Sequence, residues 1–181
     1  IVKNKKLVKS DIQLGPIKGE GNAAVAKSGQ KATGKPIYIG VCGPFTGQNQ
    51  AFGEMIEMGA KLKIEEINAA GGIKGRPLVA KWGDDEGVNS KASNVAKGLA
   101  LDKDVVAIVG HFNSTCSLAA KPIYTDNKVP MLSPGSTNVD VCKGSDWIFR
   151  NLYRDDTQGA AAATFIKEKL ATGEEPWQSA W

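Results

Sequence analysis

The chain has 181 residues, of which 41% are hydrophobic, and a formal net charge of +4. This length fits one domain with a tail, and no apolar run approaches the roughly 20 residues of a membrane-spanning helix. Residues 1–35 hold eight lysines and two acids, whereas the remainder holds 15 basic and 17 acidic residues. Because the basic segment contains no arginine and no aromatic residue, we expect a Gly/Lys-rich tail or linker that binds no nucleic acid.

Compartment and cysteine chemistry stay open at this stage. The first residues lack the apolar stretch of a secretory signal, so either the protein is intracellular or its signal has been removed. Cys42, Cys116 and Cys142 form no CxxC pair and no metal-binding spacing. We expect Cys42 to be a buried thiol in a strand, and Cys116 and Cys142 to be either free or paired.

Short apolar runs alternate with amphipathic segments along the chain. Strands are predicted at 37–41, 78–82, 105–109, 130–132 and 147–150, and helices at 52–68, 90–101, from about 114, and 155–170. The third helix should kink or lose regularity near Pro122, and Gly71-Gly72 should end the first. This order predicts an α/β fold, an open parallel sheet with helices on both faces.

Two consecutive strands are followed by loops of hydroxyl and small residues. The first loop contains Asn113, Ser114, Thr115 and Ser117; the second contains Ser133, Gly135, Ser136, Thr137 and Asn138. Taken singly, these residues are explained as helix caps and turn residues. Ligands of open α/β sheets bind at the carboxyl ends of the strands, and hydroxyls, amides and a helix N-terminus suit a small anion. The two loops together therefore predict a ligand site.

An acidic loop, Asp84-Asp85-Glu86, offers a second hypothesis. It could hold Mg²⁺, or Asp84 or Asp85 could form the phosphate or metal site of a flavodoxin- or receiver-like signalling domain. We favour a solvated loop that caps the next helix through an aspartate or Asn89, since neither hydroxyl-rich loop offers the lysine of a receiver. His111 is the only histidine, and no nucleophile motif accompanies it. We therefore expect neither an enzyme nor a bound cofactor or metal.

Several strings together resemble one family: IYIGVCGPFTG, INAAGGIKGRPL, the GDDE loop, VVAIVGHFNSTCS and PMLSPGSTN. Residues 36–170 resemble an incomplete first lobe of the type I periplasmic substrate-binding proteins that bind branched-chain amino acids for ABC importers, and residues 171–181 match nothing. The resemblance implies a periplasmic or extracytoplasmic protein. Its partners would be an amino acid or similar small carboxylate, a second lobe that this chain lacks, and a membrane permease.

The resemblance also implies roles for particular residues. Ser114 and Thr137 would donate hydroxyls to the ligand carboxylate, and Ser136 or Gly135 a backbone N–H. Phe52 would border the ligand side chain, while Asn113 and Thr115 flank Ser114. Leucine-binding members carry one cysteine in each of the loops at Glu86-Gly87 and Asn113. This chain has neither, so that disulfide is absent.

Overall fold

The computed structural model describes residues 32–170, with side chains described up to residue 168. Most of the expected tail at 1–35 and all of the segment at 171–181 lie outside the described residues. Just inside this range, residues 33–36 run beside the turn at Arg76. The amides of Thr33 and Gly34 bond to the Gly75 carbonyl, and the Arg76 guanidinium donates to the carbonyls of Lys35 and Pro36.

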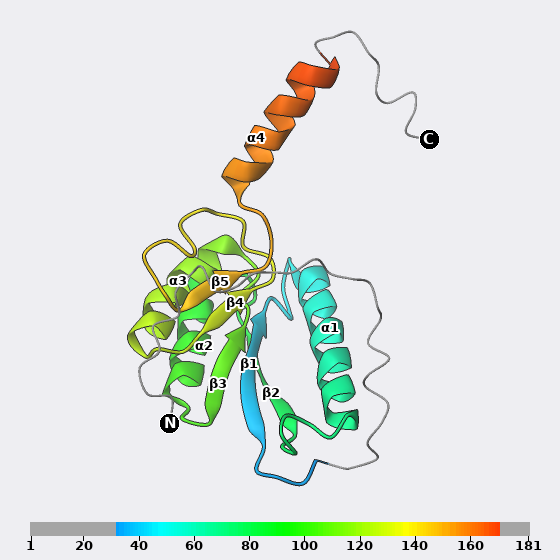
Figure 1. The fold of residues 1–181 in the computed structure, drawn as a ribbon. Helices are drawn as coiled ribbons and strands as arrows, with labels where there is room; N and C mark the ends of the chain where they lie inside the picture. Colours follow the sequence, from blue (N-terminus) through cyan, green and yellow to red (C-terminus); the bar gives the residue numbers. More distant parts are fainter. Residues whose placement is uncertain (1–31, 171–181) are drawn as a thin grey trace.

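A five-stranded parallel sheet forms the centre of the molecule (Figure 1). Its strands are β1 (Ile37–Gly43), β2 (Leu78–Asp84), β3 (Val105–Val109), β4 (Met131–Ser133) and β5 (Ile148–Arg150), in the spatial order β2-β1-β3-β4-β5. Neighbouring strands of this sheet all pair in parallel. The carboxyl ends of β1, β3 and β4 therefore lie side by side at one edge of the sheet, which confirms the predicted fold class.

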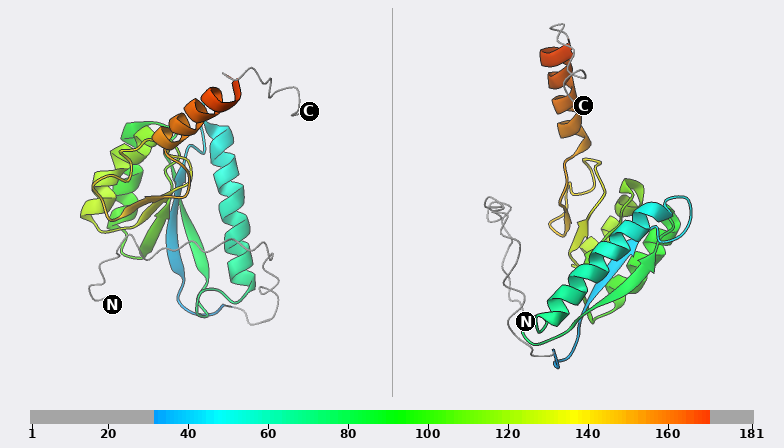
Figure 2. Two further views of the ribbon diagram at one scale, coloured as in Figure 1. Left: turned by 45° about the horizontal axis from the view of Figure 1, so that its top comes forward. Right: turned by 90° about the vertical axis from the view of Figure 1, so that its right-hand side faces the viewer.

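Helices cover both faces of this sheet. They are α1 (Gln50–Ala69), α2 (Asn89–Leu101), α3 (Ser114–Asp126) and α4 (Asp155–Phe165), which continues as the π-helical turn η2 (Ile166–Leu170). Figures 1 and 2 show α1 on one face and the α2–α3 pair on the other. We expected the third helix to kink or lose regularity near Pro122. Helix α3 instead continues through Pro122 to Asp126, so the expected loss of regularity is wrong. Gly71 and Gly72 end α1 at positive φ, as predicted.

The core lies between the sheet and the α2–α3 pair. Its buried members include Cys42 of β1, Ile108 of β3, Tyr124 of α3, Met131 of β4 and Ile148 of β5. Strands β1 and β3 approach closely, since a Cβ on Gly110 would lie 2.3 Å from the Cys42 carbonyl oxygen. The expected burial of the Cys42 thiol is confirmed.

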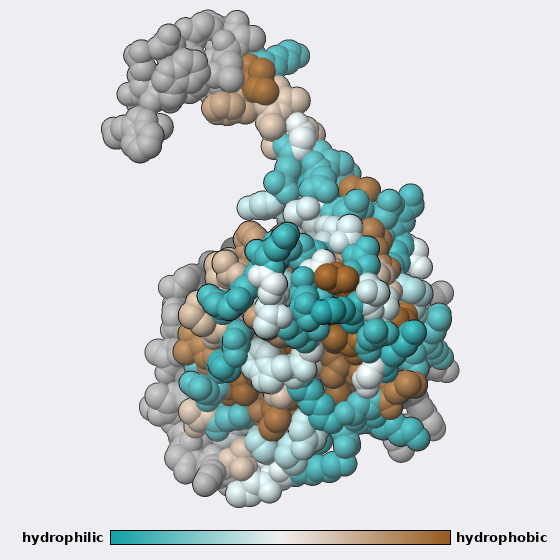
Figure 3. All heavy atoms as spheres, turned by 180° about the vertical axis from the view of Figure 1, so that it is seen from behind, coloured by the Kyte–Doolittle hydropathy of each residue, from teal (hydrophilic) through white to brown (hydrophobic). Residues whose placement is uncertain are grey.

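The α1 face is less completely covered than the α2–α3 face. An open apolar groove of about 560 Å³ lies between α1 and the sheet, lined by residues that include Ile39, Ile56, Ile64 and Phe112. Three apolar side chains of α1 are more than half exposed: Met55, which also lines this groove, Met58 and Leu62. Viewed from behind (Figure 3), hydrophilic residues dominate the surface, and the hydrophobic patches between them are small and separate.

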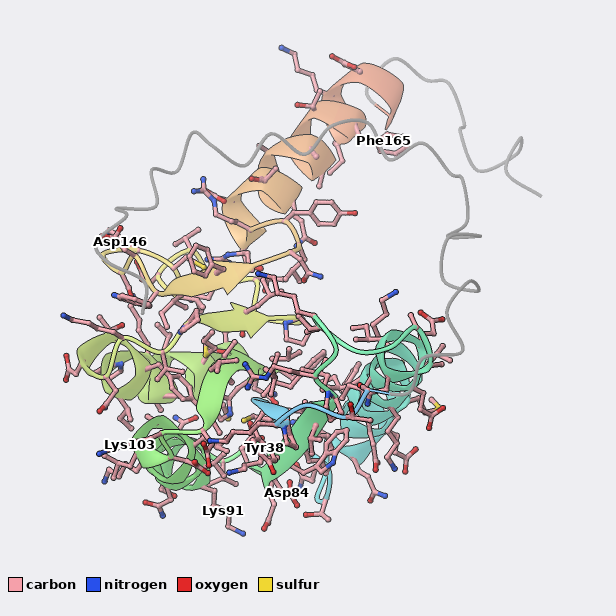
Figure 4. All side chains as sticks on the ribbon, turned by 60° about the horizontal axis from the view of Figure 1, so that its bottom comes forward. Tyr38, Asp84, Lys91, Lys103, Asp146 and Phe165 are labelled. Atoms are coloured by element: carbon pink, nitrogen blue, oxygen red, sulfur yellow. The ribbon has the colours of Figure 1, made fainter. Side chains whose placement is uncertain are left out.

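Helix α4 projects away from the sheet in all ribbon views (Figures 1 and 2). Its residues are exposed along the whole helix, and Figure 4 places Phe165 on it, far from the strands. Asp155 and Asp156 lie in its first turn, where the helix dipole favours negative charge. Among the described helices, none has the length and apolar character required to cross a bilayer.

Two glycines of α1 provide a matched test of how this helix is seated. A Cβ on Gly53 would lie 2.2 Å from the Pro44 carbonyl oxygen, whereas a Cβ on Gly59 would meet nothing within 4 Å. We expect Gly59→Ala to raise the free energy of unfolding by about 0.5–1 kcal/mol through helix propensity. Gly53→Ala should lower it by roughly 1–3 kcal/mol, because the backbone must move apart. Urea unfolding curves of the two variants measure both changes, and equal effects would contradict this seating of α1.

Candidate ligand-binding site

The hydroxyl-rich loops meet at the carboxyl ends of β3 and β4, as predicted. The Gly110 amide donates to the Leu132 carbonyl at 2.9 Å, which joins the two strand ends. The hydroxyls of Ser117 and Ser136 lie 2.7 Å apart and link the loop after β3 to the loop after β4. Parallel neighbours always end at the same sheet edge, so the strand order alone brings these loops together.

The N-terminus of α3 opens onto this edge. Asn113 is its N-cap residue, with φ −67° and ψ 133°, and its side chain makes no capping hydrogen bond. The expectation that the serine and threonine hydroxyls cap this helix is wrong for Ser114, whose Oγ instead accepts from the Asn138 amide at 3.3 Å. Among residues 32–168, the N-cap position of α3 thus provides no side-chain capping bond to the first-turn amides, which suits an anionic ligand.

The residues expected to donate to the ligand differ in whether their donor groups already form hydrogen bonds within the protein. Ser136 is fully buried, and its amide donates to Ser133 Oγ at 3.0 Å. The Gly135 amide points to the same oxygen at 3.4 Å. By contrast, the Thr137 hydroxyl has no hydrogen-bond partner among residues 32–168, and Thr115 is exposed. The hydroxyls of Ser114 and Thr137 are thus the available donors, beside the exposed Thr115, which also bonds to the Cys116 thiol. The Ser136 amide is already bonded within its own loop, and its hydroxyl is bonded to Ser117 and Phe112.

An aromatic pair borders the polar donors. Phe52 of α1 stacks on Phe112 with ring centroids 4.6 Å apart and an interplanar angle of 18°. A Cβ on Gly135 would lie 2.3 Å from the Phe112 ring, so only glycine leaves room for this ring position. Phe52 is 42% exposed. Sequence reasoning placed Phe52 at the site but missed Phe112, although an aromatic residue directly after the strand-end Gly110-His111 was an available signal.

The loops at Gly87 and Asn113 lie against each other without a disulfide. A Cβ on Gly87 would lie 3.5 Å from Asn113 Oδ1 and 2.9 Å from the Asn49 side-chain nitrogen. Asn113 Oδ1 is a buried oxygen with no hydrogen-bond partner among the described residues. All three cysteines are free thiols, so Cys116 and Cys142 do not pair. Burial raises the pKa of the Cys42 thiol to about 12, so this thiol stays protonated and unreactive.

The acidic loop is not the solvated segment we expected. Asp85 is completely buried, with Oδ1 accepting from the Gly87 amide at 2.8 Å and Oδ2 lying 2.6 Å from His111 Nδ1. Asp84 accepts from the Thr46 hydroxyl and from the amides of Phe45, Thr46 and Glu86. The N-cap residue of α2 is Val88, not an aspartate or Asn89. These contacts occupy both carboxylates with internal bonds.

Neither carboxylate is left to serve as a phosphate acceptor or metal ligand. No group of three or more His, Cys, Asp or Glu side chains among residues 32–168 could hold a metal ion. The flavodoxin- or receiver-like alternative therefore has no support at Asp84 or Asp85.

Comparison with known proteins identifies the family of this site and fold. The family model described as periplasmic binding protein matches residues 36–174. The chain therefore belongs to the periplasmic binding protein family.

Two curated relatives are similar to this chain in sequence. An amino acid binding protein of Pseudomonas aeruginosa is 40% identical over 135 residues, covering 74% of this chain and 36% of the relative. A Leu/Ile/Val-binding protein homolog of Brucella abortus is 37% identical over 131 residues, covering 72% and 35%. The chain thus spans little more than a third of these relatives.

Solved structures give the same fold. The branched-chain amino acid transporter substrate binding protein LivJ of Streptococcus pneumoniae, in complex with isoleucine, matches with a TM-score of 0.71 and 34% identity, covering 76% of this chain and 39% of that one. A leucine binding protein of Thermotoga maritima matches with a TM-score of 0.68 and 37% identity, covering 75% and 38%. A solute binding protein of Rhodopseudomonas palustris with bound 3,4-dihydroxybenzoic acid, at 24% identity, shares the fold.

The internal bonding of Asp84 leads to a pH prediction. Partial burial alone would raise its pKa, but the bonds from the Thr46 hydroxyl and from the amides of Glu86, Thr46 and Phe45 outweigh burial, and the pKa lies below its ordinary value. A folded-state pKa below the unfolded one stabilises the protein above the unfolded pKa, and this stabilisation is lost as the pH falls through the folded pKa.

We therefore expect the free energy of unfolding of the natural chain to fall more steeply between about pH 5 and about pH 2 than that of Asp84→Asn. Urea unfolding at a series of pH values measures the difference. Asp126→Asn, which removes an exposed carboxylate of α3, controls for the loss of one negative charge. Parallel pH curves for the natural chain and Asp84→Asn would show that the hydrogen bonds to Asp84 are not what stabilises this loop.

Proposed function

We propose that this chain holds the carboxylate end of an amino acid with an apolar side chain, as one lobe of an extracytoplasmic solute-binding protein. The observation that carries the proposal is the juxtaposition of an aromatic wall, Phe52 stacked on Phe112, with the N-terminus of α3 and the Thr137 hydroxyl. Within the described part of the chain, this N-terminus has no side-chain cap and this hydroxyl has no hydrogen-bond partner. Such a site can bind a small molecule that carries a negative charge at one end and an apolar body at the other.

Each residue has a role in this proposal. Ser114, Thr115 and Thr137 bind the carboxylate through hydroxyls and amides, and Phe52 and Phe112 contact the apolar body of the ligand. Asn113, Gly135 and Ser136 shape the two loops from within. The names of the relatives support a branched-chain amino acid as the ligand, since they are an amino acid binding protein, a Leu/Ile/Val-binding protein homolog and an isoleucine complex.

Delivery to an ABC transporter follows from the same likeness. We infer that the protein acts on the outer side of the cytoplasmic membrane and presents its ligand to a membrane permease. We also infer that residues 36–170 form the first of two lobes, because the matched region covers only about 35–39% of the relatives that share its fold. The second lobe would then contribute the groups that bind the ligand ammonium. A binding role needs no chemical step, and we propose no enzymatic activity.

The available contacts limit the affinity of this chain alone. Hydrogen bonds to a charged group contribute roughly 1.5–3 kcal/mol each, and a helix N-terminus about 0.3–1 kcal/mol. Micromolar binding requires about 8 kcal/mol after the loss of translational and rotational freedom has been offset. Three donors in an open site do not supply this much.

We expect this chain to bind L-leucine, L-isoleucine or L-valine with a dissociation constant in the millimolar range or weaker. Titration followed by amide chemical shifts in NMR spectra measures such weak binding. The shifts should move for residues 112–115 and 137 and stay constant for residues 84–86. Leucinamide, which lacks the carboxylate, serves as the matched control and should leave these amides unchanged. A micromolar constant would contradict the affinity limit of this chain alone, and equal shifts with leucinamide would refute the proposed carboxylate site.

Removal of the donors tests the individual roles. We expect Ser114→Ala and Thr137→Val each to weaken leucine binding by about tenfold or more, since each removes one hydroxyl that bonds to a charged group. Ser90→Ala, which changes an exposed serine in the first turn of α2, is the matched control and should bind as the natural chain does. Amide shift titrations of the three variants measure the change. If Ser90→Ala weakens binding as much as the site variants, the assignment of the site is wrong.

A further inference from the structure

A chain of buried polar side chains lies directly beneath the candidate ligand-binding site. It contains Cys42, Asp85, His111 and Tyr124, and each of these residues is fully buried. His111 Nδ1 lies 2.6 Å from Asp85 Oδ2, His111 Nε2 lies 3.3 Å from the Tyr124 hydroxyl, and this hydroxyl lies 3.9 Å from Cys42 Sγ. The four residues come from β1, from the ends of β2 and β3, and from α3. None of them is exposed to a ligand.

This buried arrangement needs a reason, because polar groups in a core rarely add stability over apolar side chains of the same size. A buried carboxylate requires full hydrogen bonding, and a partly satisfied network destabilises the fold. Asp85 is satisfied by the Gly87 amide and by His111 Nδ1–H. The 2.6 Å contact with Asp85 Oδ2 therefore holds the His111 ring in one position and orientation. An apolar side chain would fill the same space without that direction.

The backbone of His111 connects this network to the loops of the site. Its carbonyl oxygen accepts from the Ser133 hydroxyl at 2.7 Å and from the Ser117 hydroxyl at 3.1 Å, which uses both of its lone pairs. Ser133 Oγ in turn accepts from the Ser136 amide at 3.0 Å. Ser117 lies in α3, and Ser136 directly precedes the proposed donor Thr137. One carbonyl thus joins the helix that carries Ser114 to the loop that carries Thr137.

We propose that Asp85 and His111 are positioning residues for ligand binding. Their buried bond fixes the His111 carbonyl, and this carbonyl sets the distance between the α3 N-terminus and the loop at residues 133–138. The inference deepens the proposed function and rests on it for the identity of the ligand. The positioning itself is a property of the unliganded chain. It is therefore measurable without any ligand.

Local amide exchange separates positioning from a general effect on stability. We expect Asp85→Asn to speed hydrogen exchange of the Ser136 amide by at least about tenfold, while amides of β1 and β3 exchange as in the natural chain. A purely structural role would instead reduce protection of loop and strand amides in parallel. Tyr124→Phe is the matched control, because it removes the hydroxyl on the other side of the ring and leaves the Asp85 bond in place. Its Ser136 amide should exchange at the natural rate.

Substitution of His111 provides a rescue experiment. In His111→Asn the side-chain amide nitrogen can take the place of Nδ1 and donate to Asp85, whereas His111→Leu has no donor. We expect slow exchange of the Ser136 amide in His111→Asn and fast exchange in His111→Leu. If His111→Leu does not fold, Asp85→Asn and His111→Asn still decide the question. Because His111 is the only histidine, one ring N–H signal in the ¹⁵N spectrum reports the bond to Asp85, and it should exchange slowly with water in the natural chain.

Leucine binding completes the test. At the leucine concentration that half-saturates the natural chain, Asp85→Asn should show clearly smaller amide shifts at Ser114 and Thr137, and Tyr124→Phe should show the natural shifts. If the natural chain binds no amino acid, the proposed function fails, and the exchange comparison still decides whether Asp85 and His111 position the loops. Parallel loss of protection throughout the sheet in Asp85→Asn, or an equal loop effect in Tyr124→Phe, would overturn the inference.

Discussion

Every parallel strand of this sheet ends at the same edge, and the polar groups that gather there must all find hydrogen-bond partners. The order β2-β1-β3-β4-β5 places the ends of β1, β3 and β4 next to one another. The chain meets this constraint by dividing its polar groups between two depths. Asp85, His111, Ser117, Ser133 and Ser136 are buried and bonded to one another. Ser114, Thr115 and Thr137 remain closer to solvent. The buried set gives the loops their shape, and the outer set is left with free donors.

This division explains which parts of the site could be read from the sequence. The strands and helices were predicted within a few residues of their observed bounds, because hydrophobic periodicity and glycine positions are local signals. The meeting of the two hydroxyl-rich loops was also predictable, since strand order and parallel direction determine it. Local signals gave no information on which hydroxyl is buried and which is free. Ser136 and Thr137 are adjacent in the chain and similar in chemistry, yet only Ser136 is enclosed.

The errors share a physical cause. Asp85 was expected in a solvated loop because three adjacent acids usually prefer water, but its partner His111 lies 26 residues further along the chain. The expectation near Pro122 followed from the missing backbone donor. Tertiary packing compensates for the missing backbone hydrogen bond, because α3 buries Ala120 and Tyr124 on either side of the proline. The position of Phe112 directly after a strand end was a local signal that it lies near the site, but its stacking on Phe52 of α1 was not, because the two residues are far apart in the chain. Long-range pairs of this kind become visible only in three dimensions.

The geometry of the site also bears on ligand selection. An aromatic wall accepts a branched aliphatic side chain or a phenyl ring with similar gain in buried apolar area. The neighbouring donors recognise a carboxylate in either case. In the site that we propose, the wall and the donors would select a carboxylate next to an apolar body, without distinguishing an amino acid from an aromatic acid. That distinction requires acceptors for an ammonium group, because a buried charge without a partner is strongly disfavoured. Specificity within this class of ligand must accordingly come from groups that face this lobe across the ligand.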